Sequence, residues 1–191
     1  MDSGGANLAS IRYALERLGA RSEVSADGST IASAERVVLP GIGAAGHAME
    51  RLRASGLISV LKTLTQPVLG ICLGMQLLYH DSEEGRTKCL GLIPGTVRRI
   101  HGAPGRPVPH MGWNQLRPSC EDPLLQGITD QDYAYFVHTY AAPVGEETLA
   151  ETRYGDRLSA VVRRRNFCGA QFHPERSGKV GARLLKNFLR L

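Results

Sequence analysis

The segment with the clearest chemical potential is residues 70–76, where Gly70 and Gly74 lie two positions before and after Cys72. An apolar run at 67–69 leads in and a helix-like run at 75–79 leads out, so the pattern predicts a strand, a sharp turn and a helix, with cysteine at the serine position of the G-x-S-x-G motif. Such a turn holds the nucleophile in a strained backbone conformation, so the flanking residues must have almost no side chain, and glycine meets this requirement. N–H groups at the helix start favour a thiolate and can hold an oxyanion. The alternative is a buried structural cysteine at a strand end.

A cysteine nucleophile needs a base, and His173 stands out among the six histidines. An apolar segment at 167–172 delivers it to a predicted strand end, and Pro174 makes the chain turn because its φ is fixed. That turn can bring Glu175 back to the imidazole, where a carboxylate fixes the tautomer and stabilises the imidazolium. The pattern predicts a triad of Cys72, His173 and Glu175. The alternative is a solvent-exposed His-Pro-Glu turn.

A second glycine-rich turn follows the predicted strand at 36–39, where Gly41, Gly43 and Gly46 satisfy G-x-G-x-x-G. A dinucleotide site would need an acidic residue about 20 positions further on, but after Glu50 the next acid is Asp81. We therefore favour the alternative that residues 40–43 lay backbone N–H groups beside the cysteine and complete an oxyanion hole. No cofactor is expected, and because the cysteines are scattered without a C-x-x-C pair, no metal is expected either.

The elements that must position these residues follow from the pattern of the chain. Alternating strands and helices in the first half predict an open, mostly parallel α/β sheet flanked by helices, and the second half predicts an antiparallel extension. Ligands gather at the carboxyl ends of parallel strands, where both glycine turns fall. The expected helices are 8–18, 49–56, 57–64, 75–79 and 180–191; the expected strands are 21–24, 36–39, 67–69, 96–100, 113–116, 133–137, 148–154, 158–162 and 167–172; residues 81–88 are expected to form a charged surface loop.

Composition places the chain among ordinary globular proteins, with 42% hydrophobic and 21% charged residues, and its 191 residues predict one domain over 1–191. The net charge of +5 is modest, and its densest basic points, at 163–165 and 98–99, favour a solvated strand end or an acidic protein partner over nucleic acid. The scattered cysteines, the lack of a signal-peptide pattern and the lack of a long apolar stretch predict a cytoplasmic protein. Because a glycine-rich turn before a helix normally follows a strand, we expect that a first strand is missing before Met1.

Together, residues 70–76 and 171–175 resemble the triad, or class I, glutamine amidotransferases. Residues 109–114, 135–140, 40–43 and 48–49 are similar to the glutaminase subunits of imidazole glycerol phosphate synthase, and the resemblance runs over effectively the whole chain. It implies the class I glutamine amidotransferase-like fold and hydrolysis of glutamine to glutamate and ammonia. Cys72 would attack the amide, His173 would protonate the departing ammonia and Glu175 would orient His173.

The resemblance also implies roles for residues around the triad. Gly43 and the N–H of Leu73 would hold the oxyanion, and the residues that bind glutamine would be Gly41, Gln76, Thr139 and Tyr140. Thr139 stands where serine is common in the family, and it keeps the hydroxyl group. The alternative for Gln76 is an exposed helix residue.

The implied partner is a barrel-shaped cyclase subunit that receives the ammonia in a heterodimer and makes imidazole glycerol phosphate and aminoimidazole carboxamide ribonucleotide in histidine biosynthesis. Trp113 and Asn114 would lie near that interface, and the alternative for Trp113 is ordinary core packing. The rival functions are a glutaminase subunit that serves anthranilate, aminodeoxychorismate or pyridoxal phosphate synthesis, a non-catalytic subunit of the same fold, and a cysteine peptidase.

Overall fold

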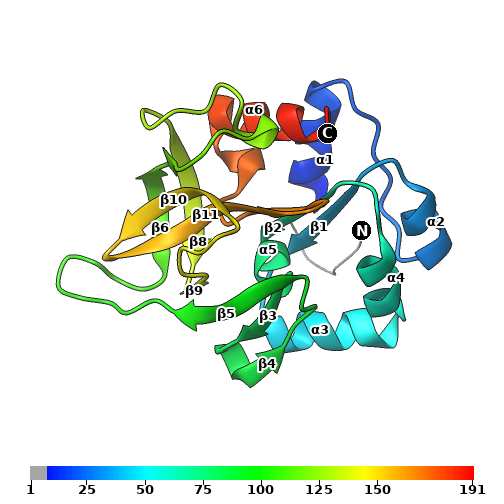
Figure 1. Ribbon diagram of the computed structural model, residues 1–191, viewed down its shortest axis with the longest axis horizontal. Helices are drawn as coiled ribbons and strands as arrows, with labels where there is room; N and C mark the ends of the chain where they lie inside the picture. Colours follow the sequence, from blue (N-terminus) through cyan, green and yellow to red (C-terminus); the bar gives the residue numbers. More distant parts are fainter. Residues whose placement is uncertain (1–7) are drawn as a thin grey trace.

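Within residues 8–191, the part of the chain that the computed structural model describes, a six-stranded sheet runs through the centre of the molecule (Figure 1). The first three strands in the spatial order are parallel and the others are antiparallel, which confirms the predicted α/β fold with an antiparallel extension, although the sheet as a whole is mixed rather than mostly parallel. The expected strand before Met1 lies outside the described residues. In spatial order the strands are β1 (Val37–Gly41), β2 (Val68–Cys72), β12 (Phe167–Ala170), β11 (Asp156–Arg164), β10 (Thr148–Tyr154) and β7 (Arg117–Pro118).

Helices cover both faces of this sheet (Figure 1). On one face, α2 (Gly28–Ser33), α3 (Ala45–Ala54) and α4 (Leu57–Thr63) pack over β1 and over Val68 of β2. On the other, α1 (Leu8–Arg17) and α6 (Gly178–Phe188) pack over Leu69 and Ile71 of the same strand. Because β2 is buried on both faces, it is a continuous apolar run that leads to Cys72 rather than an alternating one.

The remaining strands of the described chain form two smaller sheets. One contains β3 (Tyr79–Ser82), β4 (Thr87–Lys88), β5 (Ile93–Arg99) and β9 (Tyr140–Ala141). The other is an antiparallel ribbon of β6 (His110–Gln115) and β8 (Tyr133–His138), which we call the β6–β8 ribbon. Short helical turns complete the fold: α5 (Leu73–Leu77), η1 (Glu84–Arg86), η2 (Pro123–Leu125) and η3 (Pro174–Arg176).

The structure corrects three local predictions. Residues 21–24 form no strand, since no strand of the described chain pairs with them. The expected helix at 75–79 starts and ends earlier, as α5, because Tyr79 already pairs in β3. The expected surface loop at 81–88 contains a paired segment in which Asp81 faces Lys88, and these two side chains form an ion pair at 2.8 Å. The sequence prediction also missed α2, whose first turn is capped by the Asp27 carboxylate accepting from the Thr30 N–H at 2.7 Å.

Three glycines let β1, β2 and α5 approach one another closely. A methyl group on Gly74 would lie 1.8 Å from the Leu39 carbonyl oxygen, and one on Gly70 would lie 2.6 Å from the Gly74 carbonyl oxygen. A methyl group on Gly41 would lie 2.5 Å from the Gly74 nitrogen. Each contact involves backbone, which cannot move aside as a flexible side chain can. The predicted need for glycines around the cysteine is therefore a packing requirement as well as a conformational one.

We expect Gly74→Ala to destabilise the fold by more than about 3 kcal/mol, because the new methyl group would force β1 away from α5. Gly145→Ala is the matched control, since nothing lies within 4 Å of the position that its methyl group would take, and it should change stability by less than about 1 kcal/mol. Chemical denaturation of both variants measures the difference. Equal stability of Gly74→Ala and the unsubstituted chain would contradict the packing described above.

Candidate active site

Cys72 lies at the junction of β2 and α5 with a backbone conformation that few residues adopt. Its φ is 54° and its ψ is −113°, a region that costs a non-glycine residue on the order of 1–3 kcal/mol. The residue is only 8% exposed, and it pairs with Gly41 across the parallel strands β1 and β2. The predicted strand, turn and helix are therefore present, and the second glycine turn lies beside the cysteine as expected.

The strand pairing carries His173 to the same edge of the sheet. β12 runs parallel to β2 with Ala170 opposite Ile71, so both chains leave the sheet together. The backbone N–H of His173 then donates to the Tyr135 carbonyl at 3.0 Å, which ties the turn to β8. The turn brings Glu175 Oε1 to 2.9 Å from Nδ1 of His173, and the Glu175 side chain is fully buried. The expectation that Pro174 would return the carboxylate to the imidazole is confirmed, and the alternative of an exposed turn is wrong.

The charges around His173 favour its imidazolium form. Burial alone would lower the pKa of His173, but hydrogen bonds and charge interactions with Cys72 and Glu175 outweigh it and raise the pKa to about 10. Because Nδ1 faces Glu175, Nε2 is the ring nitrogen left for the sulfur. The three side chains thus form one hydrogen-bonded group that can transfer a proton at Nε2.

Two glutamine side chains lie directly behind the sulfur. Gln171 Nε2 lies 3.9 Å from Cys72 Sγ, and Gln171 Oε1 accepts from Gln76 Nε2 at 3.0 Å. Gln76 Nε2 also donates to the Tyr140 carbonyl at 2.8 Å, and only 4% of Gln76 is exposed. The alternative of Gln76 as an exposed helix residue is therefore wrong. The sequence prediction gave Gln171 no role, although its position two residues before His173 in an extended segment was a usable signal, since such residues share a face.

The remaining predicted binding residues surround this group. Gly43 follows β1 with a φ of +87°, a conformation that favours glycine. Leu73 is the residue after Cys72 and begins α5. Thr139 and Tyr140 are half-buried where β8 leads into β9, and the Thr139 carbonyl accepts from the Ile100 N–H at 2.9 Å. The structure brings these residues to the edge that carries the triad, and their roles toward the oxyanion and glutamine stay predictions.

The two predicted interface residues point in opposite directions from β6. Trp113 is 57% exposed and its ring contacts Tyr135 edge-on at 6.0 Å, so the alternative of ordinary core packing is wrong. Asn114 turns inward, where its Nδ2 lies 3.2 Å from His110 Nε2 and donates to the Arg153 carbonyl at 3.0 Å. Residues that alternate along a strand face opposite sides of it, which explains this division.

Two buried histidines lie on the inner side of the β6–β8 ribbon. His110 is 2% exposed and His138 is 5% exposed, and His110 Nδ1 lies 2.8 Å from His138 Nε2. Burial disfavours the imidazolium form, and it lowers the pKa of His110 to about 4 and that of His138 to about 3. Both rings are therefore neutral near pH 7.

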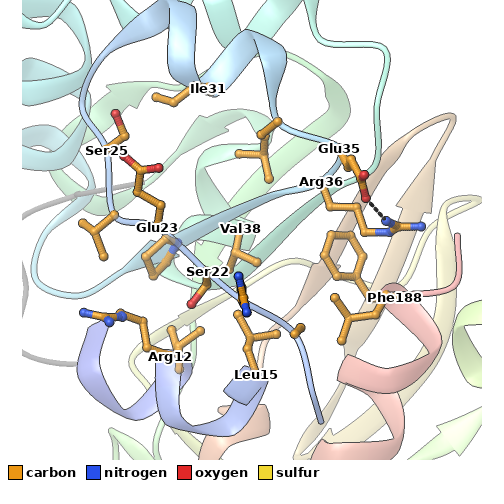
Figure 2. Close-up of a pocket in the computed structure, with 18 of the residues that line it drawn as sticks. Arg12, Leu15, Ser22, Glu23, Ser25, Ile31, Glu35, Arg36, Val38 and Phe188 are labelled. Atoms are coloured by element: carbon orange, nitrogen blue, oxygen red, sulfur yellow. Dashed lines mark hydrogen bonds and ion pairs between the residues drawn. The ribbon is translucent and has the colours of Figure 1, made fainter. Parts of the chain in front are cut away.

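A pocket of about 690 Å³ lies apart from the triad. Figure 2 shows that three parts of the chain surround it: α1, β1 at Val38, and the segment after α1 that contains Ser22 and Glu23. None of the predicted site residues lines it. Among residues 8–191 no cluster of three metal-ligating side chains is present, and no helix in that range has the length and apolar character needed to cross a bilayer.

A family model and individual relatives of this chain point to the same protein family. The family described as glutamine amidotransferase class-I matches residues 1–191. A protein of Xanthomonas euvesicatoria pv. vesicatoria (strain 85-10), named imidazole glycerol phosphate synthase subunit HisH, is 56% identical over 191 residues, which are 100% of this chain and 96% of that protein. A protein of the same name from Idiomarina loihiensis is 51% identical with the same coverage.

Solved structures support the fold. A crystal structure of a glutamine amidotransferase is 22% identical with a TM-score of 0.74, covering 97% of this chain and 93% of that one. A putative GMP synthase protein from Thermoplasma acidophilum is 19% identical with a TM-score of 0.75, covering 100% of this chain and 90% of that one. At these identities the likeness concerns the fold alone.

We expect the pKa of His173 to fall toward its ordinary value of 6.5 in both Cys72→Ala and Glu175→Gln, because each variant removes one of the groups that raise it. An NMR titration of the His173 ring measures the change. The same raised pKa stabilises the fold below pH 6.5, and this contribution is lost as the pH rises toward 10. An unchanged His173 pKa in both variants would contradict the hydrogen-bonded group.

The buried histidine pair predicts the opposite pH dependence. Because the folded pKa values of His110 and His138 lie below 6.5, their neutral forms stabilise the fold above pH 6.5, and this stability is lost as the pH falls. Between pH 6.5 and 5, before most carboxylates titrate, the free energy of unfolding should fall with a slope that approaches about 1.4 kcal/mol per pH unit for each ring.

Denaturation at several pH values tests this slope. His110→Phe should roughly halve it, whereas replacement of the exposed His101 by Asn should leave it unchanged. A flat profile in the unsubstituted protein over this pH range would show that the pair is not buried in its neutral form.

Proposed function

The chain belongs to the class-I glutamine amidotransferase family, and from that premise we propose that it is the glutaminase subunit of an imidazole glycerol phosphate synthase. It hydrolyses glutamine to glutamate and ammonia, and a cyclase subunit uses the ammonia in histidine biosynthesis. The observation that carries the proposal is the buried group formed by Cys72, His173 and Glu175 at the edge of the sheet. The 56% and 51% sequence identity to the two named relatives, over all 191 residues of this chain, supports the choice of synthase.

The first half of the reaction forms a thioester. The Cys72 thiolate, paired with the His173 imidazolium, attacks the side-chain carbonyl carbon of glutamine, and the carbonyl oxygen becomes an oxyanion. When this intermediate collapses, the bond from carbon to nitrogen breaks and Nε2 of His173 gives its proton to the leaving nitrogen. Ammonia departs and a γ-glutamyl thioester remains on the sulfur. Glu175 stabilises the imidazolium that is needed at this step.

The second half returns the enzyme to its starting state. Neutral His173 takes a proton from a water molecule as that water attacks the thioester carbonyl. The bond from carbon to sulfur breaks, glutamate leaves and the thiolate regains its imidazolium partner. The N–H groups of Gly43 and Leu73 are proposed to hold the oxyanion in both halves, where preorganised donors are worth most. Gly41, Gln76, Thr139 and Tyr140 are proposed to hold the glutamine.

The exposed outer side of the β6–β8 ribbon supports a protein partner. Met111, Trp113 and Tyr133 are 62%, 57% and 52% exposed, and they form an apolar face around an aromatic anchor. We propose that this face binds the cyclase subunit in a cytoplasmic heterodimer with overall lyase activity, and that turnover of glutamine stays low until the cyclase is bound. Free ammonia mostly becomes ammonium in neutral water, and ammonium is not a nucleophile. A synthase that uses ammonia therefore needs to pass it from one subunit to the other without releasing it to water.

We expect Cys72→Ala to lower glutaminase activity by at least about 10³-fold, because the variant lacks the sulfur that forms the thioester beside His173. Cys120→Ala is the matched control, since Cys120 is exposed and should keep the full rate. Release of glutamate and ammonia in the presence of the cyclase measures both. Comparable activity of Cys72→Ala and Cys120→Ala would contradict the nucleophile assignment.

We expect Trp113→Ala to weaken cyclase binding by about 30-fold, the cost of losing a strong interface anchor. Tyr13→Ala, which removes an aromatic side chain of similar exposure on α1, should not affect binding. Titration calorimetry measures the affinity. The cyclase could also fail to stimulate the glutaminase while the partner chain of an anthranilate or aminodeoxychorismate synthase does so. That result would contradict the proposed assignment and favour one of the rival synthases.

A further inference from the structure

The inner side of the β6–β8 ribbon carries a row of polar side chains that the proposed chemistry does not use. Asn114 Nδ2 lies 3.2 Å from His110 Nε2, and His110 Nδ1 lies 2.8 Å from His138 Nε2. His138 Nδ1 lies 2.8 Å from the Tyr140 carbonyl oxygen. A row of polar side chains whose hydrogen bonds are all satisfied fixes a single arrangement of those side chains, which apolar packing alone does less strictly.

The direction of every hydrogen bond in this row is determined. A carbonyl oxygen can only accept, so Nδ1 of His138 carries the proton. Burial keeps both rings neutral, so His138 Nε2 is bare and accepts from Nδ1 of His110. His110 Nε2 is then bare as well, and it accepts from the Asn114 amide. The three side chains therefore donate in one direction, from Asn114 toward Tyr140.

The row continues to the nucleophile through the two glutamines. The Tyr140 carbonyl accepts from Gln76 Nε2 as well as from His138. Gln76 also donates to Gln171, whose amide nitrogen lies 3.9 Å from the Cys72 sulfur. The Tyr140 carbonyl is thus the point where the ribbon and the triad meet.

The outer end of the row adjoins the proposed docking face. Trp113 and Asn114 are neighbours on β6, and one faces solvent while the other faces inward. A partner that presses on Trp113 must therefore shift or fix the backbone that positions Asn114. β8 touches the triad independently, because the Val137 carbonyl lies 3.7 Å from Cys72 Sγ and the Tyr135 carbonyl accepts from the His173 N–H.

We propose that Asn114, His110 and His138 form a positioning relay that couples partner docking at the β6–β8 ribbon to the orientation of Tyr140, Gln76 and the Cys72 sulfur. The relay moves no proton during turnover. It fixes which way the Tyr140 carbonyl and the Gln76 amide point, and the docked partner fixes the relay. This inference rests on the proposed function, because it assigns a path to the stimulation that the cyclase provides.

The aromatic surroundings of His110 allow a substitution that keeps its shape. Its ring is stacked on Tyr154 at 4.0 Å and on Phe136 at 5.0 Å. His110→Phe preserves both stacks and removes both hydrogen bonds of the ring. The stimulation factor is the glutaminase rate with saturating cyclase divided by the rate without it. We expect it to fall by at least about tenfold, because both hydrogen bonds of the ring are lost and one such bond alone is worth up to about tenfold. The dissociation constant for the cyclase should stay within about twofold.

Two matched controls separate this effect from general damage. His101→Phe changes an exposed histidine outside the relay and should keep the full stimulation factor. Leu61→Ala removes a buried side chain of α4 and lowers stability without touching the relay. If Leu61→Ala loses stability to a similar extent yet keeps its stimulation, the loss in His110→Phe belongs to the hydrogen bonds.

The direction of the relay is tested by Asn114→Asp, which keeps the size of the side chain but replaces its amide donor by an acceptor. His110 would then have to carry its proton on Nε2, which leaves two bare nitrogens facing each other between His110 and His138. Nitrogen-15 NMR reports the tautomer of each ring. We expect Nδ1–H on both rings in the unsubstituted protein and a change at His110 in Asn114→Asp, together with a reduced stimulation factor.

The outcomes separate the relay from the proposed function. If the unsubstituted protein shows no cyclase-stimulated glutaminase activity, the proposed function is wrong, and the relay proposal, which explains that stimulation, is wrong as well. If that activity is present but His110→Phe keeps the full stimulation factor, the relay is wrong and the function stands. Nε2–H tautomers of both rings in the unsubstituted protein would overturn the relay on structural grounds, whatever the rates show.

Discussion

The close approach of three backbone segments at Cys72 is the constraint on which the rest of the site depends. The cysteine can keep its strained φ of 54° only because α5 starts within contact distance of β1 and β2. That contact exists because Gly70 and Gly74 have no side chain to prevent it. Parallel pairing of β12 with β2 then brings His173 to the same edge without a special turn. Strain at Cys72 is thus offset by the packing of a sheet that is buried on both faces.

β8 lies between the Cys72 site and the exposed side of the β6–β8 ribbon. Its backbone contacts the sulfur at Val137 and the His173 turn at Tyr135, and it ends at His138, whose ring faces the Tyr140 carbonyl. Its partner strand, β6, carries the exposed Trp113. A two-stranded ribbon has few hydrogen bonds of its own, so contacts on either side influence its position. This is a physical reason for the proposed partner-binding face and the proposed catalytic edge to share one small element.

The sequence predicted most of what depends on local pattern. The glycines around Cys72 and the turn at Pro174 have fixed conformational consequences, and the strands of the main sheet carry strong apolar signals. The strand expected at 21–24 was wrong because no strand of the described chain pairs with it, and the loop expected at 81–88 was wrong because its two ends pair with each other. Gln171 and the His110–His138 pair were missed because their partners are distant in sequence, 99 and 28 residues away along the chain. The resemblance to a known family, rather than periodicity, supplied the substrate and the partner.

The covalent bond between Cys72 and the carbonyl carbon of glutamine is the central claim. Acid quenching of the enzyme with its cyclase during turnover of isotope-labelled glutamine, followed by peptide mapping, tests it most directly. We predict a labelled γ-glutamyl thioester on the peptide that contains Cys72, and its absence from Cys72→Ala. Steady release of ammonia with the label on another residue, or a thioester that persists in Cys72→Ala, would contradict it.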